Sequence, residues 1–141
     1  EKVAKIYLIK NAGEVQKIIL PIKGKGLWST MYGFLALMTD TKTVDGFGFY
    51  DQGETPGLGG EVDNPRWKAK WVGKVIVDEN YTPNLDVVKG TVREGEEASH
   101  QVDGLSGATL TANGVENLVN YWMGDNAFGL FLKKVRAGGM L

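Results

Sequence analysis

The chain has 141 residues, enough for one domain with its own hydrophobic core, and its composition of 43% hydrophobic and 23% charged residues is that of an ordinary globular protein. A net charge of -1 excludes the basic surface that nucleic-acid binding requires, and the lack of cysteine excludes disulfides, thiolate metal sites and a cysteine nucleophile. We therefore expect a single domain, residues 1–141, with no nucleic-acid partner. Twenty glycines, roughly twice the usual share of about 7%, indicate tight turns or close approach to a ligand.

The chain contains no signal peptide and no apolar run of about 18 residues that would span a bilayer. It starts at Glu1 rather than at Met, so we expect that an upstream segment has been removed. That segment could have included a membrane anchor.

Strand patterns dominate the first half of the chain. Residues 3–9 and 15–22 predict a hairpin around the turn at 11–14, ended by Pro21 and Gly24. Residues 27–38 fit either a helix or a buried strand, and a strand is favoured for residues 34–39, before the aromatic run 47–50. The segment 53–60 is too rich in glycine for either element and predicts a loop.

The middle of the chain predicts shorter elements. Asn64 and Pro65 mark the start of a short amphipathic helix that carries Trp67 and Trp71. Two strands are expected at residues 74–77 and 85–89, followed by a polar, exposed segment at 94–100.

Helices follow in the last third. Val115, Leu118, Val119 and Trp122 have helical spacing, and Gly124 stands where a C-terminal cap is expected. The start of this helix is open: Asn113 and Glu116 form a loose capping pair, while the preceding turn offers the hydroxyls of Ser106, Thr109 and Thr111. A second amphipathic stretch, 128–135, directs Phe131 and Leu132 inward and Lys133, Lys134 and Arg136 outward.

Strands grouped before helices predict an α+β fold, a twisted and largely antiparallel sheet packed with a few helices. The glycines of residues 53–60 do not follow the strand, G-x-G-x-x-G, helix order of a dinucleotide site.

Few residues offer catalytic chemistry. His100, Asp103 and Ser106 lie in one loop, but triads are assembled in space and residues 104–108 lack the last glycine of a nucleophile elbow, so we reject a hydrolase. One histidine without cysteine argues against a zinc site, and an exposed imidazole is the simpler interpretation of His100. Carboxylates such as Glu54, Glu61 and Asp63 could bind a hard cation but are more commonly solvated loop charges. We predict no metal site and no catalytic residue.

Residues 103–109, Asp-Gly-Leu-Ser-Gly-Ala-Thr, form a small-residue loop that leads into the predicted helix. Backbone N–H groups in such a loop can approach an anion, and the helix dipole favours a phosphate there. The alternative is an ordinary helix start, with Asp103 in an Asx turn and Thr109 as a cap, and composition alone favours this alternative.

The same seven residues match the flavinylation signature D-G-x-S/T-G-A-T at every specified position. Further stretches extend the resemblance over nearly the whole chain: residues 24–29, 53–61, 103–111 and 128–136. In this order they resemble the family formed by the C subunit of the Na+-translocating NADH:quinone reductase.

The resemblance implies a covalently bound FMN, attached to Thr109 by a phosphodiester bond. It implies that Ser106, Gly107 and Ala108 frame the phosphate, and that Asp103 and Gly104 belong to the sequence recognised by the flavin transferase. It further implies residues that line the flavin ring, namely Trp28, Glu54, Thr55 and Leu58, with Lys89 as a further candidate contact. From patterning alone, Trp28 and Leu58 would instead be core residues and Glu54 a solvated turn residue.

The resemblance also implies a place in a membrane complex. The domain is expected on the periplasmic side of the bacterial inner membrane, behind an N-terminal membrane helix, where its FMN relays electrons between the subunits that oxidise NADH and reduce quinone. We do not expect turnover by the isolated domain. A threonine hydroxyl is a weak nucleophile, and no base is evident near Thr109, so a Mg2+-dependent transferase that takes FMN from FAD is expected to attach it.

Two alternatives stay open at this point. A homologous flavinylated subunit of a ferredoxin:NAD electron-transport complex carries the same threonine signature, but residues 53–61 and 128–136 fit the quinone reductase better. A cofactor-free assembly domain that packs against membrane partners would give a colourless protein.

Overall fold

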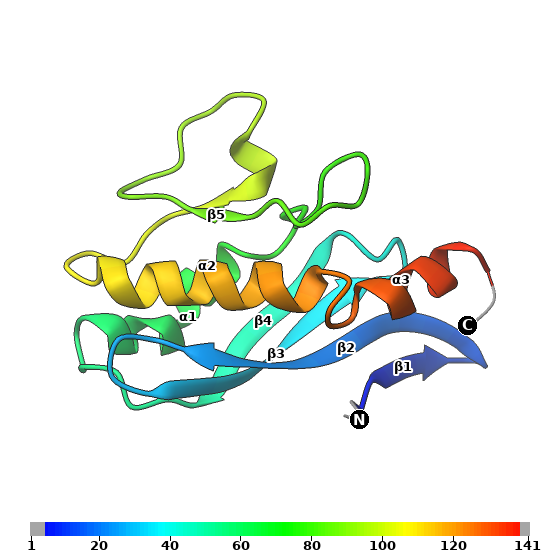
Figure 1. The fold of residues 1–141 in the computed structure, drawn as a ribbon, viewed down its shortest axis with the longest axis horizontal. Coiled ribbons are helices and arrows are strands. Elements are labelled where there is room, and N and C mark those ends of the chain that lie inside the picture. The colour runs from blue at the N-terminus through cyan, green and yellow to red at the C-terminus, as the bar shows by residue number, and fades with distance from the viewer. Residues whose placement is uncertain (1–4, 139–141) are drawn as a thin grey trace.

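A computed structural model describes residues 5–138 and shows a four-stranded antiparallel sheet with helices on one side (Figure 1). The strands follow one another in space in the order of the sequence. Their bounds are Tyr7–Asn11 for β1, Glu14–Lys25 for β2, Thr30–Met38 for β3 and Val44–Asp51 for β4. The predicted α+β class with an antiparallel sheet is confirmed.

The predicted hairpin is present as β1 and β2, in which Asn11 pairs with Glu14 across a two-residue turn. Ala12 and Gly13 both have positive φ, 55° and 84°, as the tight turns of hairpins require. Residues 3 and 4 of the predicted first strand lie outside the described residues. Pro21 and Gly24 were expected to mark the end of the second strand; Pro21 does not, because β2 continues to Lys25, one residue past Gly24. Among the described residues, pairing with β1 stops at Ile19, so no strand of residues 5–138 pairs with Pro21 on that side, and a missing N–H is tolerated at such an edge.

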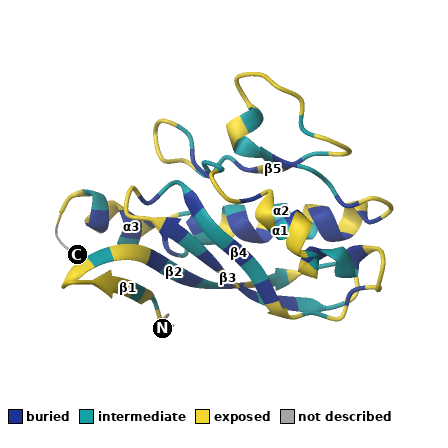
Figure 2. Ribbon diagram, turned by 180° about the vertical axis from the view of Figure 1, so that it is seen from behind, coloured by how far each residue is buried: buried dark blue, intermediate teal, exposed yellow. Residues whose placement is uncertain are grey.

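The ambiguous stretch 27–38 is resolved as strand β3 over most of its length, not only over its second half. β3 pairs with β2 from Lys17↔Met38 to Lys25↔Thr30. Figure 2 shows buried stretches along β2, β3 and β4 in dark blue. The side chains of these strands on the inner face are buried: Ile18, Leu20, Ile22, Leu35, Leu37, Phe47 and Phe49.

The predicted short helix is confirmed as α1, Pro65–Ala69, which follows the 3-10 turn η1, Gly59–Asp63, but it ends before Trp71, which it was expected to carry. Asn64 caps α1 because its side chain accepts a hydrogen bond from the N–H of Arg66 at 2.8 Å. Trp67 and Trp71 are buried, and the Trp71 ring stacks on Phe47 with 4.0 Å between centroids. Aromatic packing thus fixes α1 against β4.

Between α1 and the next helix the chain is largely irregular. The expected strand 74–77 is wrong, since its only pairings among the described residues are the isolated bridges Thr43↔Val75 and Val77↔Pro83. The expected strand 85–89 shrinks to β5, Asp86–Val87, which pairs in parallel with β6, Gln101–Val102. Ile76 and Val77 are buried in the core although they belong to a loop. Their apolar character reflects this burial, and without a neighbouring strand they do not form the hydrogen-bond ladder of a sheet.

The polar segment 94–100 is exposed as predicted at residues 94–97 and ends in the 3-10 turn η2, Ala98–His100. His100 itself is half-buried, and its Nδ1 lies 2.6 Å from the carbonyl oxygen of Val75. The expectation of a free, exposed imidazole is therefore wrong, because this ring joins two loops.

Helix α2, Thr109–Met123, lies across the inner face of the sheet, and Gly124 is its C-cap as predicted (Figure 1). It starts four residues before Asn113, so the Asn113 and Glu116 capping pair is wrong. Glu116 instead accepts a hydrogen bond from the N–H of Val87 at 2.8 Å. A side chain on Gly114 would collide with the carbonyl oxygen of Lys25, which shows how closely α2 approaches β2.

Helix α3, Gly129–Arg136, buries Leu132 and Val135 and half-buries Phe131. Lys133 and Lys134 are exposed as expected. Arg136 does not point outward, because its guanidinium lies 3.8 Å from the centre of the Tyr81 ring, a cation–π contact.

Candidate functional site

Thr109 is the first residue of α2 and is exposed to solvent. The chain reaches it through an exposed turn at Ser106 and Gly107, in which Gly107 has a φ of 71°, followed by the buried Ala108. Thr109 borders a small recess of about 60 Å³, and Lys89 lines the same recess from the loop after β5. The predicted attachment residue and one predicted contact thus lie together.

The N-terminus of α2 keeps free hydrogen-bond donors. No side chain caps it, and within residues 5–138 the backbone N–H groups of Thr109, Leu110 and Thr111 have no protein acceptor. Unpaired N–H groups at a helix start, together with the helix dipole, favour an anion. The predicted cap at Thr109 is wrong, since the residue belongs to the helix.

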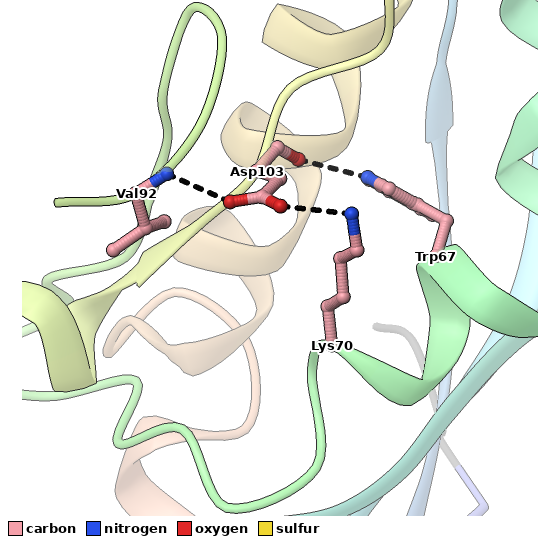
Figure 3. A network of polar contacts seen from close by, with 4 residues as sticks. All are labelled: Trp67, Lys70, Val92 and Asp103. Atoms are coloured by element: carbon pink, nitrogen blue, oxygen red, sulfur yellow. Dashed lines mark hydrogen bonds and ion pairs between the residues drawn. The ribbon is translucent and has the colours of Figure 1, made fainter.

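Asp103 anchors the loop that precedes α2 (Figure 3). Its carboxylate accepts hydrogen bonds from Lys70 Nζ at 2.8 Å and from the N–H of Val92 at 2.7 Å, and its carbonyl oxygen accepts one from Trp67 Nε1 at 2.8 Å. The hydrogen bond from Lys70, helped by that from Val92, lowers the pKa of Asp103 below its ordinary value. These contacts take the place of the Asx turn that the sequence allowed.

Gly104 is needed for its small size. An added side chain would collide with the carbonyl oxygen of Val88, and the N–H of Gly104 donates to the carbonyl oxygen of Gly90 at 2.9 Å. The loop before α2 is therefore packed against the segment that carries Lys89. Sequence analysis did not find Trp67, Lys70 or Val92 as partners of this loop, because they are distant in the chain and form no motif with it.

Glu54 is the most connected side chain of the site. Only 4% of its surface is exposed, so the interpretation as a solvated turn residue is wrong. Its two oxygens accept hydrogen bonds from five donors: the N–H groups of Leu27 (2.8 Å), Trp28 (3.1 Å) and Ser29 (2.8 Å), and the hydroxyls of Ser29 (2.6 Å) and Thr111 (2.7 Å). Burial raises the pKa of Glu54, but these hydrogen bonds outweigh it and lower the pKa to about 2.

Glu54 joins three segments that are far apart in the sequence. The turn between β2 and β3 carries Trp28, the loop after β4 carries Thr55 and Leu58, and α2 carries Thr111 two residues after Thr109. The carboxylate thus points into the protein. The sequence did not indicate that Ser29 and Thr111 contact Glu54, because only the fold brings these hydroxyls to its carboxylate.

Two large apolar side chains of this region are exposed rather than buried in the core. Trp28 is 71% exposed and Leu58 is 44% exposed, so their interpretation as core residues is wrong. The Leu58 side chain lies against Gly107, 3.1 Å from the position that a Cβ would take there. Thr55 is exposed, and its carbonyl oxygen accepts from the N–H groups of Leu58 and Gly60. An apolar surface thus adjoins the turn before Thr109.

Other chemistry is sparse in the described part of the chain. Residues 5–138 contain no cluster of three or more histidine or acidic side chains that could hold a metal ion. None of the helices formed by these residues is both long and apolar enough to cross a bilayer.

Comparison with known proteins places this site in a family. A family model described as an FMN-binding domain matches residues 26–124, which include all the predicted flavin contacts. The chain belongs to the FMN-binding domain family. The fold agrees: NqrC from Shewanella oneidensis, a crystal structure, superposes with a TM-score of 0.89 at 37% identity, over 95% of this chain and 61% of that one.

Two relatives by sequence confirm the predicted resemblance to the C subunit of the Na+-translocating NADH-quinone reductase. The C subunit from Vibrio parahaemolyticus is 58% identical over 135 residues, which are 96% of this chain and 51% of the relative. The C subunit from Pseudomonas aeruginosa is 53% identical over 139 residues, 98% of this chain and 53% of the relative. The chain spans about half the length of these relatives.

Proposed function

We propose that this domain carries FMN covalently on Thr109 and relays electrons within a Na+-translocating NADH:quinone reductase. The observation that carries the proposal is the solvent-exposed Thr109 at an uncapped helix start, inside the FMN-binding region of the family. FMN supplies the redox chemistry when bound, and the protein positions it and adjusts its potential.

The residues present fit a phosphate ester. Esterification leaves the phosphate a single negative charge, which the unpaired N–H groups of Thr109, Leu110 and Thr111 can accommodate without an arginine. Lys89 at the same recess supplies a cation. Ser106, Gly107 and Ala108 would frame this phosphate from the preceding turn.

The flavin ring would lie on the apolar surface next to this turn. Trp28 and Leu58 offer exposed side chains of a kind that pack against an aromatic ring system. Thr55 would complete the surface, while Glu54 holds Trp28 and Thr111 in place through its hydrogen bonds rather than through contact of its carboxylate with the ring. An exposed surface of this kind would leave one edge of the ring open to partner subunits.

Attachment requires help from outside the domain. The residues that line the recess beside Thr109 include no histidine and no carboxylate that could take the hydroxyl proton. We infer that a Mg2+-dependent flavin transferase supplies the base. In that step Thr109 Oγ bonds to the FMN phosphorus of FAD, the P–O bond to the AMP moiety breaks, AMP leaves, and the hydroxyl proton passes to the transferase.

The wider assignment follows the relatives whose names identify them as the C subunit of the Na+-translocating NADH-quinone reductase. We propose the same complex for this domain, with the domain on the periplasmic side of the bacterial inner membrane and attached through an N-terminal membrane helix. Electrons would pass through it between the NADH-oxidising and quinone-reducing subunits.

The covalent site is tested by intact mass and visible absorption after co-expression with the flavin transferase. The wild type should be yellow and heavier by one FMN-phosphoryl group. Thr109→Ala should be colourless and unmodified, while the matched control Thr91→Ala, which removes a threonine hydroxyl from an exposed loop residue outside the signature, should keep the added mass. An unmodified, colourless wild type would instead support the cofactor-free assembly domain.

A further inference from the structure

The four-stranded sheet has one covered and one bare face. Helix α2 packs on the inner face, whereas no helix formed by residues 5–138 lies on the outer face of β1–β4 (Figure 1). A sheet is stable when its apolar face is buried against another layer. The outer face is therefore the place to ask whether a layer is missing.

The outer face is apolar and exposed. Its exposed large apolar side chains are Tyr7 (47% exposed), Ile9 (44%), Phe34 (40%), Met38 (46%) and Tyr50 (68%). Three of them are contiguous, because the ring centre of Phe34 lies 6.4 Å from that of Tyr7 and 5.3 Å from that of Tyr50, and Ile9 lines the same hollow. Contiguous apolar patches of this kind are uncommon on free monomers and mark sites of contact.

The face is also hollowed along its middle. Ala36 pairs with Gly46 and Phe34 pairs with Gly48, so small residues of β3 and β4 form the floor of a trough of about 620 Å³. Aromatic side chains stand on either side of this floor. The shape and the small floor residues fit a packed polypeptide layer, such as a helix or a strand pair laid on the sheet.

Charge argues for a polypeptide with an apolar face. No charged side chain lines the trough. At its rim, Lys17 is neutralised by Asp45 at 2.8 Å, and Lys68 reaches toward Gly48. Apart from Lys68, the trough offers a charged ligand no partner among its lining residues, whereas apolar side chains would find aromatic partners.

Both solved relatives contain polypeptide beyond the part that matches this chain. The Shewanella oneidensis structure matches 95% of this chain with only 61% of its own length, and the structure of the C subunit from Parabacteroides distasonis, with a TM-score of 0.73 at 28% identity, likewise uses 61%. About two-fifths of each solved chain therefore lies outside the part that matches this fold. Other exposed apolar residues, such as Val72 and Leu130, lie outside the sheet.

We propose that the outer face of β1–β4 binds the polypeptide that the relatives carry beyond this domain. The contact is made at the trough lined by Tyr7, Ile9, Phe34, Ala36 and Tyr50. The occupant belongs to the same subunit and has an apolar face. The proposal is independent of FMN.

The first experiment uses a chimera, in which the part of the Vibrio parahaemolyticus relative that lies outside the match to this chain is joined to this chain. The two parts keep the order that they have in the relative. The chain alone should enhance the fluorescence of the apolar dye ANS, and Phe34→Ser should reduce the enhancement, whereas the chimera should give little. Phe34→Ser should lower the melting temperature of the chimera by about 10 °C, as for a buried aromatic residue, but that of the chain alone by less than about 3 °C. Val72→Ser, at an exposed residue outside the trough, is the control and should shift both proteins equally little.

A second measurement does not depend on the chimera. In the full-length Vibrio parahaemolyticus relative, hydroxyl-radical footprinting should find the aromatic side chains of the strands that match β1, β3 and β4 protected. Strong labelling of these side chains would overturn the proposal, as would equal effects of Phe34→Ser on the chain and the chimera. A Phe34-dependent dimer of this chain, or Phe34-dependent binding to lipid vesicles with the chimera unprotected, would overturn it in favour of a second copy or a membrane.

Discussion

Replacing Glu54 by Gln should destabilise the domain by about 3 kcal/mol at pH 7. The pKa of Glu54 is about 2 in the folded protein against an ordinary value of 4.5. Each pKa unit corresponds to about 1.4 kcal/mol of preference for the charged form, so the difference corresponds to about 3 kcal/mol. Because only 4% of the residue is exposed, solvent screening reduces this little. A glutamine would turn an NH2 group toward the donors that now meet two oxygens.

The sign of the pH dependence follows from the lowered pKa. The folded state binds the proton of Glu54 less readily than the unfolded state does. The stabilisation is therefore complete above about pH 4.5 and is lost as the pH falls through that range toward 2. Glu54→Gln should remove this part of the acid sensitivity, so the stability gap between wild type and variant should narrow from pH 5 to pH 2.5.

Urea unfolding followed by tryptophan fluorescence measures both effects, since Trp67 and Trp71 are buried. The matched control is Glu96→Gln, which removes a charge from an exposed loop residue and should change stability by less than about 0.5 kcal/mol. If Glu54→Gln costs as much at pH 2.5 as at pH 7, the hydrogen bonds to the charged carboxylate are not the source of the stability, and the reasoning fails.

Two further predictions concern the elements that hold α2 in place. Gly114→Ala should reduce the free energy of unfolding by about 2 kcal/mol despite the better helix propensity of alanine, because the added methyl group would collide with the carbonyl oxygen of Lys25. The control Asn117→Ala, at an exposed residue of the same helix, should not lose stability in the same urea titration. A Gly114→Ala variant as stable as the wild type would contradict the close approach of α2 to β2. Asp103→Asn should reduce the free energy of unfolding by about 1–2 kcal/mol at pH 7, and by less below pH 3.8, the ordinary pKa of an aspartate. The control Lys133→Gln, which breaks the exposed ion pair with Asp125 at 3.3 Å, should change stability by less than about 0.5 kcal/mol. Equal losses in the two variants would show that the contacts of Asp103 stabilise the fold no more than an exposed ion pair does.

Local patterns were sufficient where structure depends on near neighbours. The Asn11–Glu14 turn, the Asn64 cap of α1 and the apolar spacing of α2 all rest on contacts within a few residues, and the structure contains each of them. The fold class was also predictable, because it follows from the order of strands and helices along the chain, and local patterns indicate each of these elements. The signature at residues 103–109 identified the loop that precedes α2, and a match to an FMN-binding family agrees with it.

Tertiary structure decided which polar groups meet and which apolar groups stay exposed. No local pattern shows that Glu54 receives hydrogen bonds from Ser29 and Thr111, or that Asp103 pairs with Lys70, because these partners are 25 to 57 residues apart. Patterning also expected Trp28 in the core and a strand at residues 74–77. Burial and strand pairing depend on what the completed fold places beside a residue, and that information is spread over the whole chain.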